Sequence, residues 1–378
     1  MKSIRKVLLI FVTAFSLPGF AQNSNLSKEA RALIDEFDGR LKSNSENKSV
    51  GSLSAALVLG DTIIWTKSYG FADKERKIPA SSNTIYSIGS VSKSVTGMAL
   101  ARLVQKGILK LDEPVEKYVP EIRDIKGLPS NIRITIRELA THTSGLSRET
   151  ELPDAAEGSI KVWEKKVLAS ISMTTFDSGT YKKYSYSNIG YGILGLAMSR
   201  ASKKAFDKLI DEIVFKPLKM KNSHFELTPV MQKNLAVAYD STRDYHLGRG
   251  YKIPNGGVYS CAADMVNFAK AQLHTDFSSF LTDSIWHQVQ NFQVVSKETR
   301  DEKYGYGLGV SVWTDKGKKN WIYHNGTLAP GYSASLYCDL TAKIAIVILR
   351  NDKGSDDIAG IADEFLYRFG DLKYIYQH

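Results

Sequence analysis

The residues best suited to chemistry in this chain are Ser90 and Lys93, which lie three positions apart ahead of a long apolar stretch. If the segment from Ser90 onward is helical, the hydroxyl and the amine lie on one face of that helix. Burial favours the neutral form of a lysine, which can then act as a base. A serine at a helix N-terminus also has a backbone N–H free to bind a developing oxyanion. The pair therefore predicts a nucleophile and its activator, although a solvated helix face would have the same spacing.

A second group consists of Tyr186 and Asn188, just ahead of an apolar segment of helical spacing. A tyrosine whose pKa is lowered by neighbouring cations can act as a general base, and an asparagine amide can hold both a carbonyl and a lysine. The same segment would also suit an ordinary helix start, with Ser187 or Asn188 as the N-cap and the tyrosines in the core. The residues alone leave both interpretations open.

A third group, His324, Gly326 and Thr327, follows a segment typical of a strand. A glycine on a strand allows a substrate or another backbone to approach closely. The Thr327 N–H could then be a second oxyanion donor, and His324 a hydrogen-bonding group that titrates near neutrality. Asn325-Gly326 is also a common hairpin pair, so a simple turn is the alternative.

Both ends of the chain contain the segments that are expected to position these residues. Apolar runs and alternation predict six strands, at residues 53–59, 62–68, 307–313, 320–324, 333–339 and 344–349. Helical spacing predicts six helices, at residues 26–41, 136–141, 160–171, 189–201, 262–273 and 355–369. We therefore expect an α+β fold, in which one antiparallel sheet formed by both chain ends is flanked by helices. A mainly helical lobe over roughly residues 105–290 would be inserted between them.

The first 21 residues have the parts of a signal peptide: a basic start, an apolar core over 7–15, and small residues at Gly19 and Ala21. We predict cleavage after Ala21, which leaves residues 22–378 as a single domain. The apolar core is too short for a stable membrane anchor, and no cysteine follows it for lipid attachment. The mature protein is therefore expected to be exported, either periplasmic or secreted.

The composition narrows the classes of partner. The formal net charge of +10 is spread over many lysines, without a zinc-finger spacing or an aromatic RNA-binding signature, so a nucleic-acid partner is not expected. The charge is compatible with association with peptidoglycan in an anionic cell envelope. The seven histidines are scattered and predict no metal site. Cys261 and Cys338 could form a disulfide, or each could be a separately buried thiol.

The order of the three groups resembles that of the penicillin-recognising serine hydrolases, which include class C β-lactamases, D-Ala-D-Ala carboxypeptidases, D-aminopeptidases and esterases. That family carries Ser-x-x-Lys, then Tyr-x-Asn, then Lys-Thr-Gly or His-x-Gly. The resemblance runs roughly from residue 53 to 369 and includes segments without catalytic residues, at 111–115, 134–146, 217–220 and 256–260.

The resemblance implies a role for each group. Ser90 would be the nucleophile, Lys93 its activating partner and Tyr186 the general base and acid. The residues that would bind the substrate or its oxyanion are Asn188, His324, Gly326 and Thr327. His142 has no direct catalytic role in the family pattern, so we expect a structural histidine rather than a triad base. The family uses no metal or organic cofactor in this chemistry.

The third group departs from class C β-lactamases, because His324 and Asn325 replace the Lys and Thr of Lys-Thr-Gly. His-x-Gly occurs in the carboxypeptidase, aminopeptidase and esterase branches. The resemblance therefore implies an exported serine hydrolase that acts through an acyl-enzyme on small-molecule or peptide substrates. Its substrates would be D-amino-acid peptides of cell-wall type or small esters. A class C-like β-lactamase and a penicillin-binding protein with little turnover are the alternatives.

Overall fold

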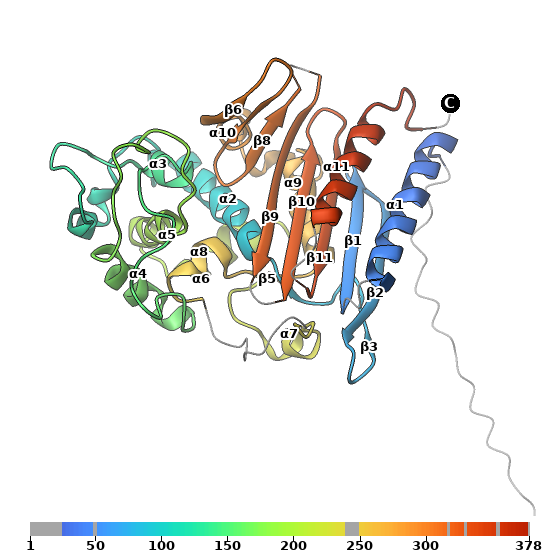
Figure 1. Ribbon diagram of the computed structural model, residues 1–378, viewed down its shortest axis with the longest axis horizontal. Coiled ribbons are helices and arrows are strands. Elements are labelled where there is room, and N and C mark those ends of the chain that lie inside the picture. The colour runs from blue at the N-terminus through green and yellow to red at the C-terminus, as the bar shows by residue number, and fades with distance from the viewer. Residues whose placement is uncertain are drawn as a thin grey trace, which may run out of the picture.

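An antiparallel sheet runs through the centre of the molecule (Figure 1). The computed structural model describes residues 25–47, 51–238, 249–315, 318–328, 331–352 and 356–376. Within these ranges the sheet has nine strands in the order β3-β2-β1-β11-β10-β9-β8-β7-β6. The predicted signal peptide, residues 1–21, lies outside the described residues.

The strands of this sheet come from both ends of the chain. They are β1 (Ser52–Leu59), β2 (Thr62–Asp73), β3 (Ile78–Pro79), β6 (Val294–Glu298), β7 (Lys303–Tyr306), β8 (Ser311–Thr314), β9 (Asn320–Leu328), β10 (Tyr332–Asp339) and β11 (Ile344–Arg350). Strand β1 pairs with β11, from Leu53 opposite Arg350 to Leu59 opposite Ile344, so the two ends of the chain meet in the middle of the sheet. A separate pair of short strands joins β4 (Tyr86–Ser87) to β5 (Tyr259–Ser260).

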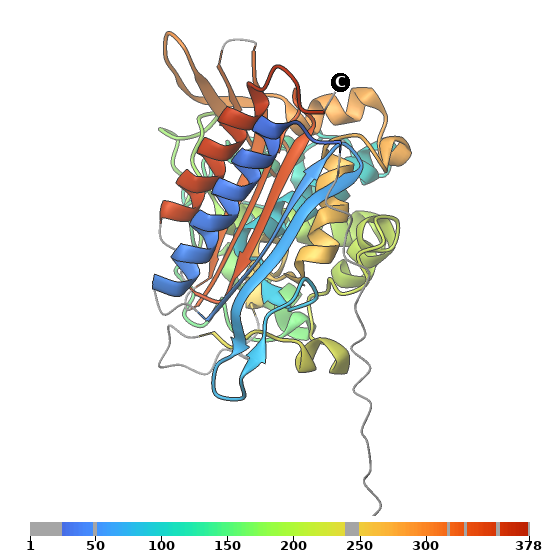
Figure 2. The ribbon, with the colours of Figure 1, turned by 90° about the vertical axis from the view of Figure 1, so that its right-hand side faces the viewer.

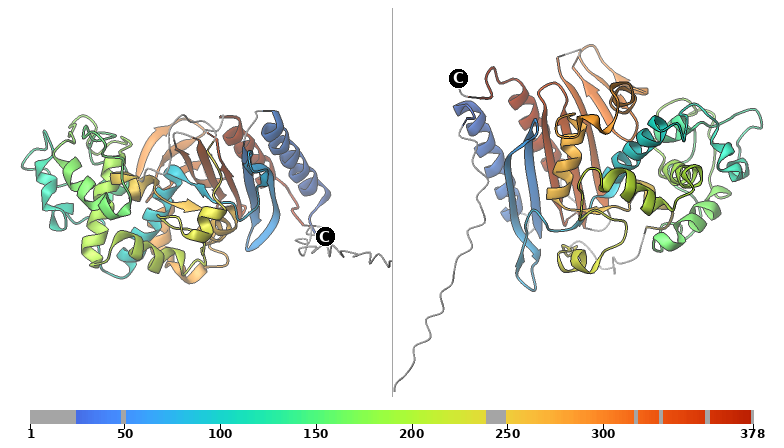
Figure 3. Two further views of the ribbon diagram at one scale, coloured as in Figure 1. Left: turned by 90° about the horizontal axis from the view of Figure 1, so that it is seen from below. Right: turned by 180° about the vertical axis from the view of Figure 1, so that it is seen from behind.

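Helices cover both faces of the sheet. Helices α1 (Lys28–Asn47) and α11 (Asp356–Gly370) lie side by side on one face (Figure 2). On the other face lie the short helix η1 (Gly89–Val91), α2 (Ser92–Gln105) and α9 (Ala262–Gln272). The helical lobe is on the same side of the sheet as these helices (Figure 3). The remaining helices of the described chain include α3 (Ile136–Ala140), α4 (Trp163–Ile171), α5 (Asn188–Ser202), α6 (Phe206–Ile210), α7 (Pro229–Lys233), α8 (Ile253–Gly256) and α10 (Asp283–Gln290).

The central strands β1 and β11 are mostly apolar because both of their faces are buried. On β11, Ala345, Val347 and Leu349 pack against the core beneath α2 and α9. The alternate residues Ile344 and Ile346 pack into the second core, beneath α1 and α11. The sheet therefore separates two hydrophobic cores, and a residue's position along a strand decides which core it enters.

The predicted architecture is confirmed: one antiparallel sheet is formed by both chain ends, and helices flank it. The strand predicted over 307–313 is confirmed only from Ser311 onward, because residues 307–310 form a tight connection and β8 covers Ser311–Thr314. In this connection the Gly307 N–H donates to the carbonyl of Val310 at 2.9 Å, and Gly309 has a φ of +83°. Strands β6 and β7 were not predicted, because β6 is mostly exposed and β7 has only four residues, so neither shows a clear apolar pattern.

Cys261 and Cys338 are separate, buried thiols, so they do not form a disulfide. Burial raises the pKa of both, in the case of Cys261 to about 12. Of the helices in the described ranges, none combines the length and the apolar character that a membrane span needs.

Candidate active site

Ser90 lies where η1 leads into α2, at the junction between the sheet and the helical lobe. Gly89 has a φ of +50°, a conformation that costs glycine little and other residues more. A Cβ atom at position 89 would lie 3.1 Å from the backbone nitrogen of Thr327 on β9. The turn at Gly89 thus brings the nucleophile's backbone directly against the third predicted group.

Helix α2 is held in place by its own hydroxyl groups, although it is buried almost all round. Ser94 donates to the Gly309 carbonyl at 2.9 Å, and Thr96 to the Pro254 carbonyl at 2.5 Å. The Ser92 hydroxyl accepts a hydrogen bond from the backbone N–H of Val258 at 3.1 Å. Since buried polar groups must be paired, these bonds fix both the depth and the rotation of the helix that carries Lys93.

Lys93 is fully buried, and its Nζ lies 3.3 Å from Oγ of Ser90. Nζ also donates to the backbone carbonyl of Asn255 at 3.1 Å. Burial lowers the pKa of Lys93 well below its usual value, and this effect outweighs the opposing attraction of Glu149. The amine is therefore poised to be neutral, with a lone pair next to the serine hydroxyl.

Tyr186 contacts the same two groups. Its side chain hydrogen-bonds to that of Ser90, and Nζ of Lys93 lies 4.7 Å from the centre of its ring. Burial raises the pKa of Tyr186 to about 12, although the hydrogen bond to Ser90 and the nearby Arg148 act in the opposite direction. The expected lowering of the tyrosine pKa by neighbouring cations is therefore wrong, because burial outweighs it. Tyr186 is a neutral phenol that can relay or donate a proton.

His142 supports the ring of Tyr186, and the two ring centres are 4.2 Å apart. Its Nδ1 accepts a hydrogen bond from the Ser187 N–H at 3.0 Å. Burial and the charge of Lys93 lower the pKa of His142 well below its usual value. A buried, neutral imidazole that packs behind the tyrosine agrees with the structural role expected for this residue.

Asn188 is the first residue of α5, and its neighbour Ser187 is the N-cap, accepting from the Gly190 N–H at 3.0 Å. The segment is thus an ordinary helix start, and it also carries the candidate site residue Asn188. The Nδ2 of Asn188 donates to Oε1 of Glu149 at 2.6 Å, while its Oδ1 is buried with no partner in the described chain. The expected contact with Lys93 is not made, because the Asn255 carbonyl takes that place.

Two residues of this constellation, Glu149 and Asn255, were missed in the sequence. Glu149 accepts hydrogen bonds from Asn188 and Tyr251 and forms an ion pair with Lys252 at 3.1 Å. Asn255 donates from Nδ2 to the Asn188 carbonyl at 2.9 Å, in addition to holding Lys93 through its own carbonyl. The only signal for them was their position beside the segments 134–146 and 256–260, which resemble the family.

Gly326 lies in the middle of the β9–β10 ladder, opposite Ala334, and Asn325 lies opposite Ser335. The alternative of an Asn-Gly turn is therefore wrong. A Cβ atom at position 326 would lie 2.1 Å from the Ile88 carbonyl oxygen and 2.8 Å from the backbone nitrogen of Ser90. Only a glycine allows this approach, which places Thr327 and Ser90, the two expected oxyanion donors, on adjoining backbone segments.

His324 is buried, with Nε2 3.1 Å from the hydroxyl of Tyr306 and Nδ1 2.8 Å from the Asn325 carbonyl oxygen. Burial and the neighbouring Lys93 lower its pKa to about 3. The expectation that His324 titrates near neutrality is therefore wrong, because the ring is removed from water beside a second basic group. The imidazole stays neutral over the physiological range.

The structure thus brings together Ser90, Lys93 and Tyr186, with Gly326 and Thr327 against the backbone of the serine. This arrangement places a hydroxyl beside a buried amine of lowered pKa and a phenol, which are groups that acyl transfer can use. In the described chain, no group of three histidine, cysteine, aspartate or glutamate side chains is arranged to hold a metal ion.

Two solved structures have the same fold. The octameric penicillin-binding protein homologue from Pyrococcus abyssi superposes with a TM-score of 0.73 at 22% identity, over 90% of this chain and 79% of that one. A class C β-lactamase in complex with cefoxitin superposes with a TM-score of 0.75 at 18% identity, over 90% and 99% respectively. At these sequence identities the structural similarity supports a statement about the fold alone.

The family follows from sequence comparison. The model of the β-lactamase family matches residues 31–367, so the chain belongs to that family and has its serine hydrolase fold. Protein flp from Staphylococcus aureus is 25% identical over 331 residues, which cover 84% of this chain and 62% of flp. Beta-lactamase-like protein 2 from Dictyostelium discoideum is 26% identical over 338 residues, which cover 86% and 60%. The chain thus spans about three-fifths of the length of these relatives.

Proposed function

We propose that this protein is an exported serine hydrolase that cleaves amide or ester bonds through an acyl-enzyme. Its substrates would be D-amino-acid peptides of cell-wall type or small esters. The observation that carries the proposal is the 3.3 Å contact between Ser90 Oγ and the buried amine of Lys93. A neutral amine at this distance can accept the hydroxyl proton as the oxygen attacks.

Acylation follows from these contacts. Ser90 Oγ forms a bond to the substrate carbonyl carbon, and its proton passes to Nζ of Lys93. The carbonyl electrons move onto the oxygen, where the N–H groups of Ser90 and Thr327 stabilise the negative charge. As the intermediate collapses, Tyr186 gives its phenolic proton to the leaving nitrogen or oxygen and regains one from Lys93. The leaving group departs as a neutral amine or alcohol.

Deacylation uses the same groups in reverse. A water molecule attacks the ester carbonyl of acylated Ser90 and loses its proton to the amine of Lys93, either directly or through the Tyr186 hydroxyl, which passes its own proton on to the amine as it accepts the one from water. The tetrahedral intermediate is stabilised by the same two N–H groups, and Ser90 recovers its proton on leaving. The products are a carboxylic acid and the free enzyme, so no cofactor is consumed.

The state of His324 favours esterase or aminopeptidase substrates, which need no carboxylate to be held at this position, over β-lactams. The imidazole is neutral, so it provides a hydrogen-bonding group where a lysine would provide a permanent positive charge. Asn325, at the next position, faces the opposite side of the sheet and hydrogen-bonds to Tyr337. Neither side chain supplies the charge that would hold an anionic β-lactam.

A substrate panel tests the proposal. The mature protein is assayed for release of D-Ala from a D-Ala-D-Ala peptide, cleavage of a p-nitrophenyl ester, hydrolysis of a chromogenic cephalosporin, and covalent labelling by a fluorescent penicillin. We expect turnover of the peptide or the ester, slow turnover of the cephalosporin, and loss of every signal in Ser90→Ala. Faster turnover of the cephalosporin than of peptide and ester would favour a class C-like β-lactamase. Stable penicillin labelling without any turnover would favour a penicillin-binding protein.

Export has a separate test. The full-length chain is expressed in a bacterial host, and the N-terminal residue of the accumulated protein is determined. A product that begins at Gln22 in the periplasmic or culture fraction supports export and cleavage after Ala21. An unprocessed product confined to the cytoplasm contradicts it, without bearing on the hydrolase chemistry.

A further inference from the structure

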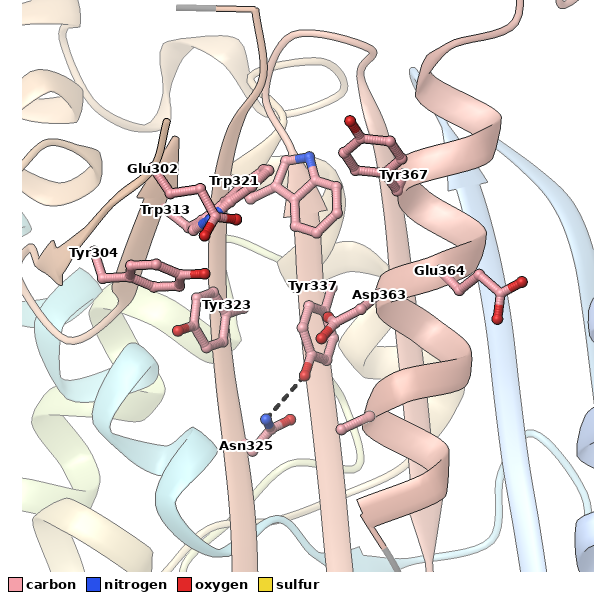
Figure 4. A pocket seen from close by; sticks show the side chains of 11 residues that line it. Glu302, Tyr304, Trp313, Trp321, Tyr323, Asn325, Tyr337, Asp363, Glu364 and Tyr367 are labelled. Carbon is pink, nitrogen blue, oxygen red and sulfur yellow. Dashed lines mark hydrogen bonds between the residues drawn. The ribbon is translucent and has the colours of Figure 1, made fainter. Parts of the chain in front are cut away.

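A cavity of about 490 Å³ lies between strands β7 to β10 and helix α11, on the face of the sheet that α11 covers (Figure 4). Along β9, Trp321, Tyr323 and Asn325 line this cavity. The alternate residue Ile322 packs into the core on the other face, and His324 faces Tyr306 in the candidate active site. The sheet therefore separates the cavity from Ser90, so a molecule bound there is not the group that is hydrolysed.

Aromatic rings form most of the wall of this space, which we call the aromatic cavity. They are Tyr304, Trp313, Trp321, Tyr323, Tyr337 and Tyr367. The centres of the two indole rings are 4.5 Å apart, and Tyr323 is stacked on Tyr337 with 6° between their planes. Figure 4 shows Asn325 reaching toward Tyr337, whose hydroxyl accepts from Asn325 Nδ2 at 2.9 Å. The rings are thus held in fixed orientations around an open space.

Two carboxylates in the cavity, Glu302 and Asp363, are held by neutral donors. Glu302 accepts from Nε1 of Trp313 at 3.3 Å, and Asp363 is hydrogen-bonded by the hydroxyl of Tyr337. Neither carboxylate forms an ion pair with any residue that the structure describes. In a chain of net charge +10, a partly enclosed space with two uncompensated negative charges is complementary to a positively charged ligand.

Glu364 provides a contrast within the same lining. It points away from the cavity in Figure 4 and pairs with Arg40 at 2.7 Å and Arg368 at 3.3 Å. Its charge is thus compensated by the protein, whereas the charges of Glu302 and Asp363 are not. No basic side chain of the described residues forms an ion pair with these two carboxylates, so a bound cation could compensate their charge.

Ammonium groups already contact the aromatic rings at the edge of this space. Nζ of Lys319 lies 3.2 Å from the centre of the Tyr367 ring, and Nζ of Lys297 lies 5.6 Å from that of Tyr304. Electron-rich rings attract cations through their quadrupole, and more strongly when water is excluded. The rings that line the cavity offer further faces of this kind, and the volume they enclose suits a small organic molecule.

We propose that the aromatic cavity is a binding site for a small organic cation with an ammonium head group. The rings would enclose the head group, and Glu302 and Asp363 would supply the opposite charge. A sugar would also stack on the rings, but it would leave both carboxylates uncompensated. The site is independent of the hydrolytic chemistry, so Ser90→Ala should bind the cation as well as the natural chain does.

The test uses Trp313 and Trp321 as reporters. The intrinsic fluorescence of the mature protein is titrated with choline, with its uncharged isostere 3,3-dimethylbutan-1-ol, and with N-acetylglucosamine. We expect a saturable change with choline and binding of the isostere that is weaker by about tenfold or more. Asp363→Asn and Glu302→Gln should each weaken choline binding several-fold, while Asp61→Asn, in the exposed β1–β2 turn, should leave it unchanged. The double variant Trp313→Phe/Trp321→Phe should remove most of the signal.

The pH dependence of binding gives a second readout. Burial raises the pKa of Asp363 to about 6. Below that pH the carboxyl becomes neutral, so choline affinity should fall there, and it should be steady above it. The phenols of Tyr304, Tyr323 and Tyr337, which face Asp363, have raised pKa values and stay neutral throughout. Glu302→Gln should keep this pH dependence, and Asp363→Asn should lose it.

Three results would overturn the proposal. One is equal affinity for choline and its isostere, which would make the site merely apolar. Another is binding of the sugar alone, with no effect of Asp363→Asn. The third is the absence of any saturable change with choline in a chain whose circular dichroism and melting temperature are normal. None of these results would bear on the reaction at Ser90.

Discussion

Lys93 is the residue on which the proposed chemistry depends. A lysine is removed from water here without a carboxylate bound to its amine, and only the Ser90 hydroxyl and the Asn255 carbonyl lie at hydrogen-bonding distance among the contacts that the structure records. The cost of burying the charge is avoided by releasing a proton. In its charged form Lys93 would destabilise the folded chain, and in its neutral form it provides the base.

Replacing this lysine by methionine should separate its contribution to stability from its contribution to catalysis. The usual pKa of the group is 10.5, and burial lowers it in the folded chain. Between the lowered value and 10.5 the unfolded chain binds one more proton at this residue, so stability rises with pH. The slope is about 1.4 kcal/mol per pH unit for one group.

We therefore expect the free energy of unfolding of the natural chain to increase from pH 7 to pH 9 relative to that of Lys93→Met, as measured by urea denaturation. The variant should fold, because methionine has a similar shape, but it should lose almost all turnover. Parallel pH dependences in the two proteins would mean that Lys93 is charged in the folded chain.

His324 should contribute a hydrogen bond and no titration near neutrality. Its pKa of about 3 leaves the ring neutral between about pH 5.5 and 7.5, so His324→Gln should lower kcat/KM without changing the shape of the pH profile there. The measurement is the pH–rate profile of the preferred substrate for both proteins. A profile that loses an inflection in His324→Gln would show that the imidazole does titrate in this range.

At this scale the residue types could be predicted from the sequence, but their protonation states could not. Ser90, Lys93 and Tyr186 were identified from spacing and family resemblance. The pKa values depend on burial and on groups from distant segments, such as Arg148 and Glu149, whose positions only the fold defines. Local sequence therefore predicted a tyrosine with a lowered pKa and a titrating histidine, and burial reversed both.

Strand β9 and helix η1 form the element pair that sets the geometry of the site. The strand passes so close to η1 that the backbone of Gly326 lies against that of Ser90. The proposed oxyanion donors therefore depend on one backbone contact between segments more than 200 residues apart in sequence.

Gly326→Ala should break this contact. Its Cβ would lie 2.1 Å from the Ile88 carbonyl oxygen, so one of the two segments must move. A displacement of about 1 Å can lower kcat by about 10²-fold, and we expect a loss of that order in the turnover of the preferred substrate.

Gly360→Ala provides the matched control, because Gly360 lies on α11 with no atom within 4 Å of its Cβ position. This change should keep full turnover and stabilise the protein by roughly 0.5–1 kcal/mol, since alanine is the better helix former. If Gly326→Ala kept the turnover of the control, the contact between β9 and η1 would not be needed for catalysis.

The elements that could be predicted are those whose pattern does not depend on neighbours. Strands β1 and β11 are mostly apolar, and α1 and α5 have clear helical spacing, so each was located, although α1 continues beyond residue 41 to Asn47. The turn at residues 307–310 and the extension of β9 through Gly326 could not be predicted. The sequence pattern alone suggested a strand for the first segment and a hairpin turn for the second. The ladder with β10 decides the second case.

At the scale of the whole molecule, the two chain ends close the sheet together. Strand β1 pairs with β11, and α1 packs beside α11, where the ring centres of Phe37 and Phe365 are 4.7 Å apart. This layer packs into one core, whereas η1 and α2, which carry Ser90 and Lys93, pack into the core on the other face of the sheet. It should therefore contribute to stability and leave the chemistry of the site unchanged.

Phe365→Ala should destabilise the protein by about 3–5 kcal/mol, as large-to-small changes of buried aromatic residues do. Urea denaturation measures this loss, and kcat of the folded fraction at low temperature should equal that of the natural chain. Val230→Ala, at an exposed position of α7, should change neither quantity. A lower kcat in fully folded Phe365→Ala would show that the outer layer shapes the site.

Peptide mass mapping after incubation with a penicillin tests whether Ser90 becomes acylated with Lys93 as its base. We expect one adduct, on the peptide that contains Ser90, which is absent in Ser90→Ala and forms far more slowly in Lys93→Met. An adduct on another residue, or formation at the natural rate in Lys93→Met, would contradict it.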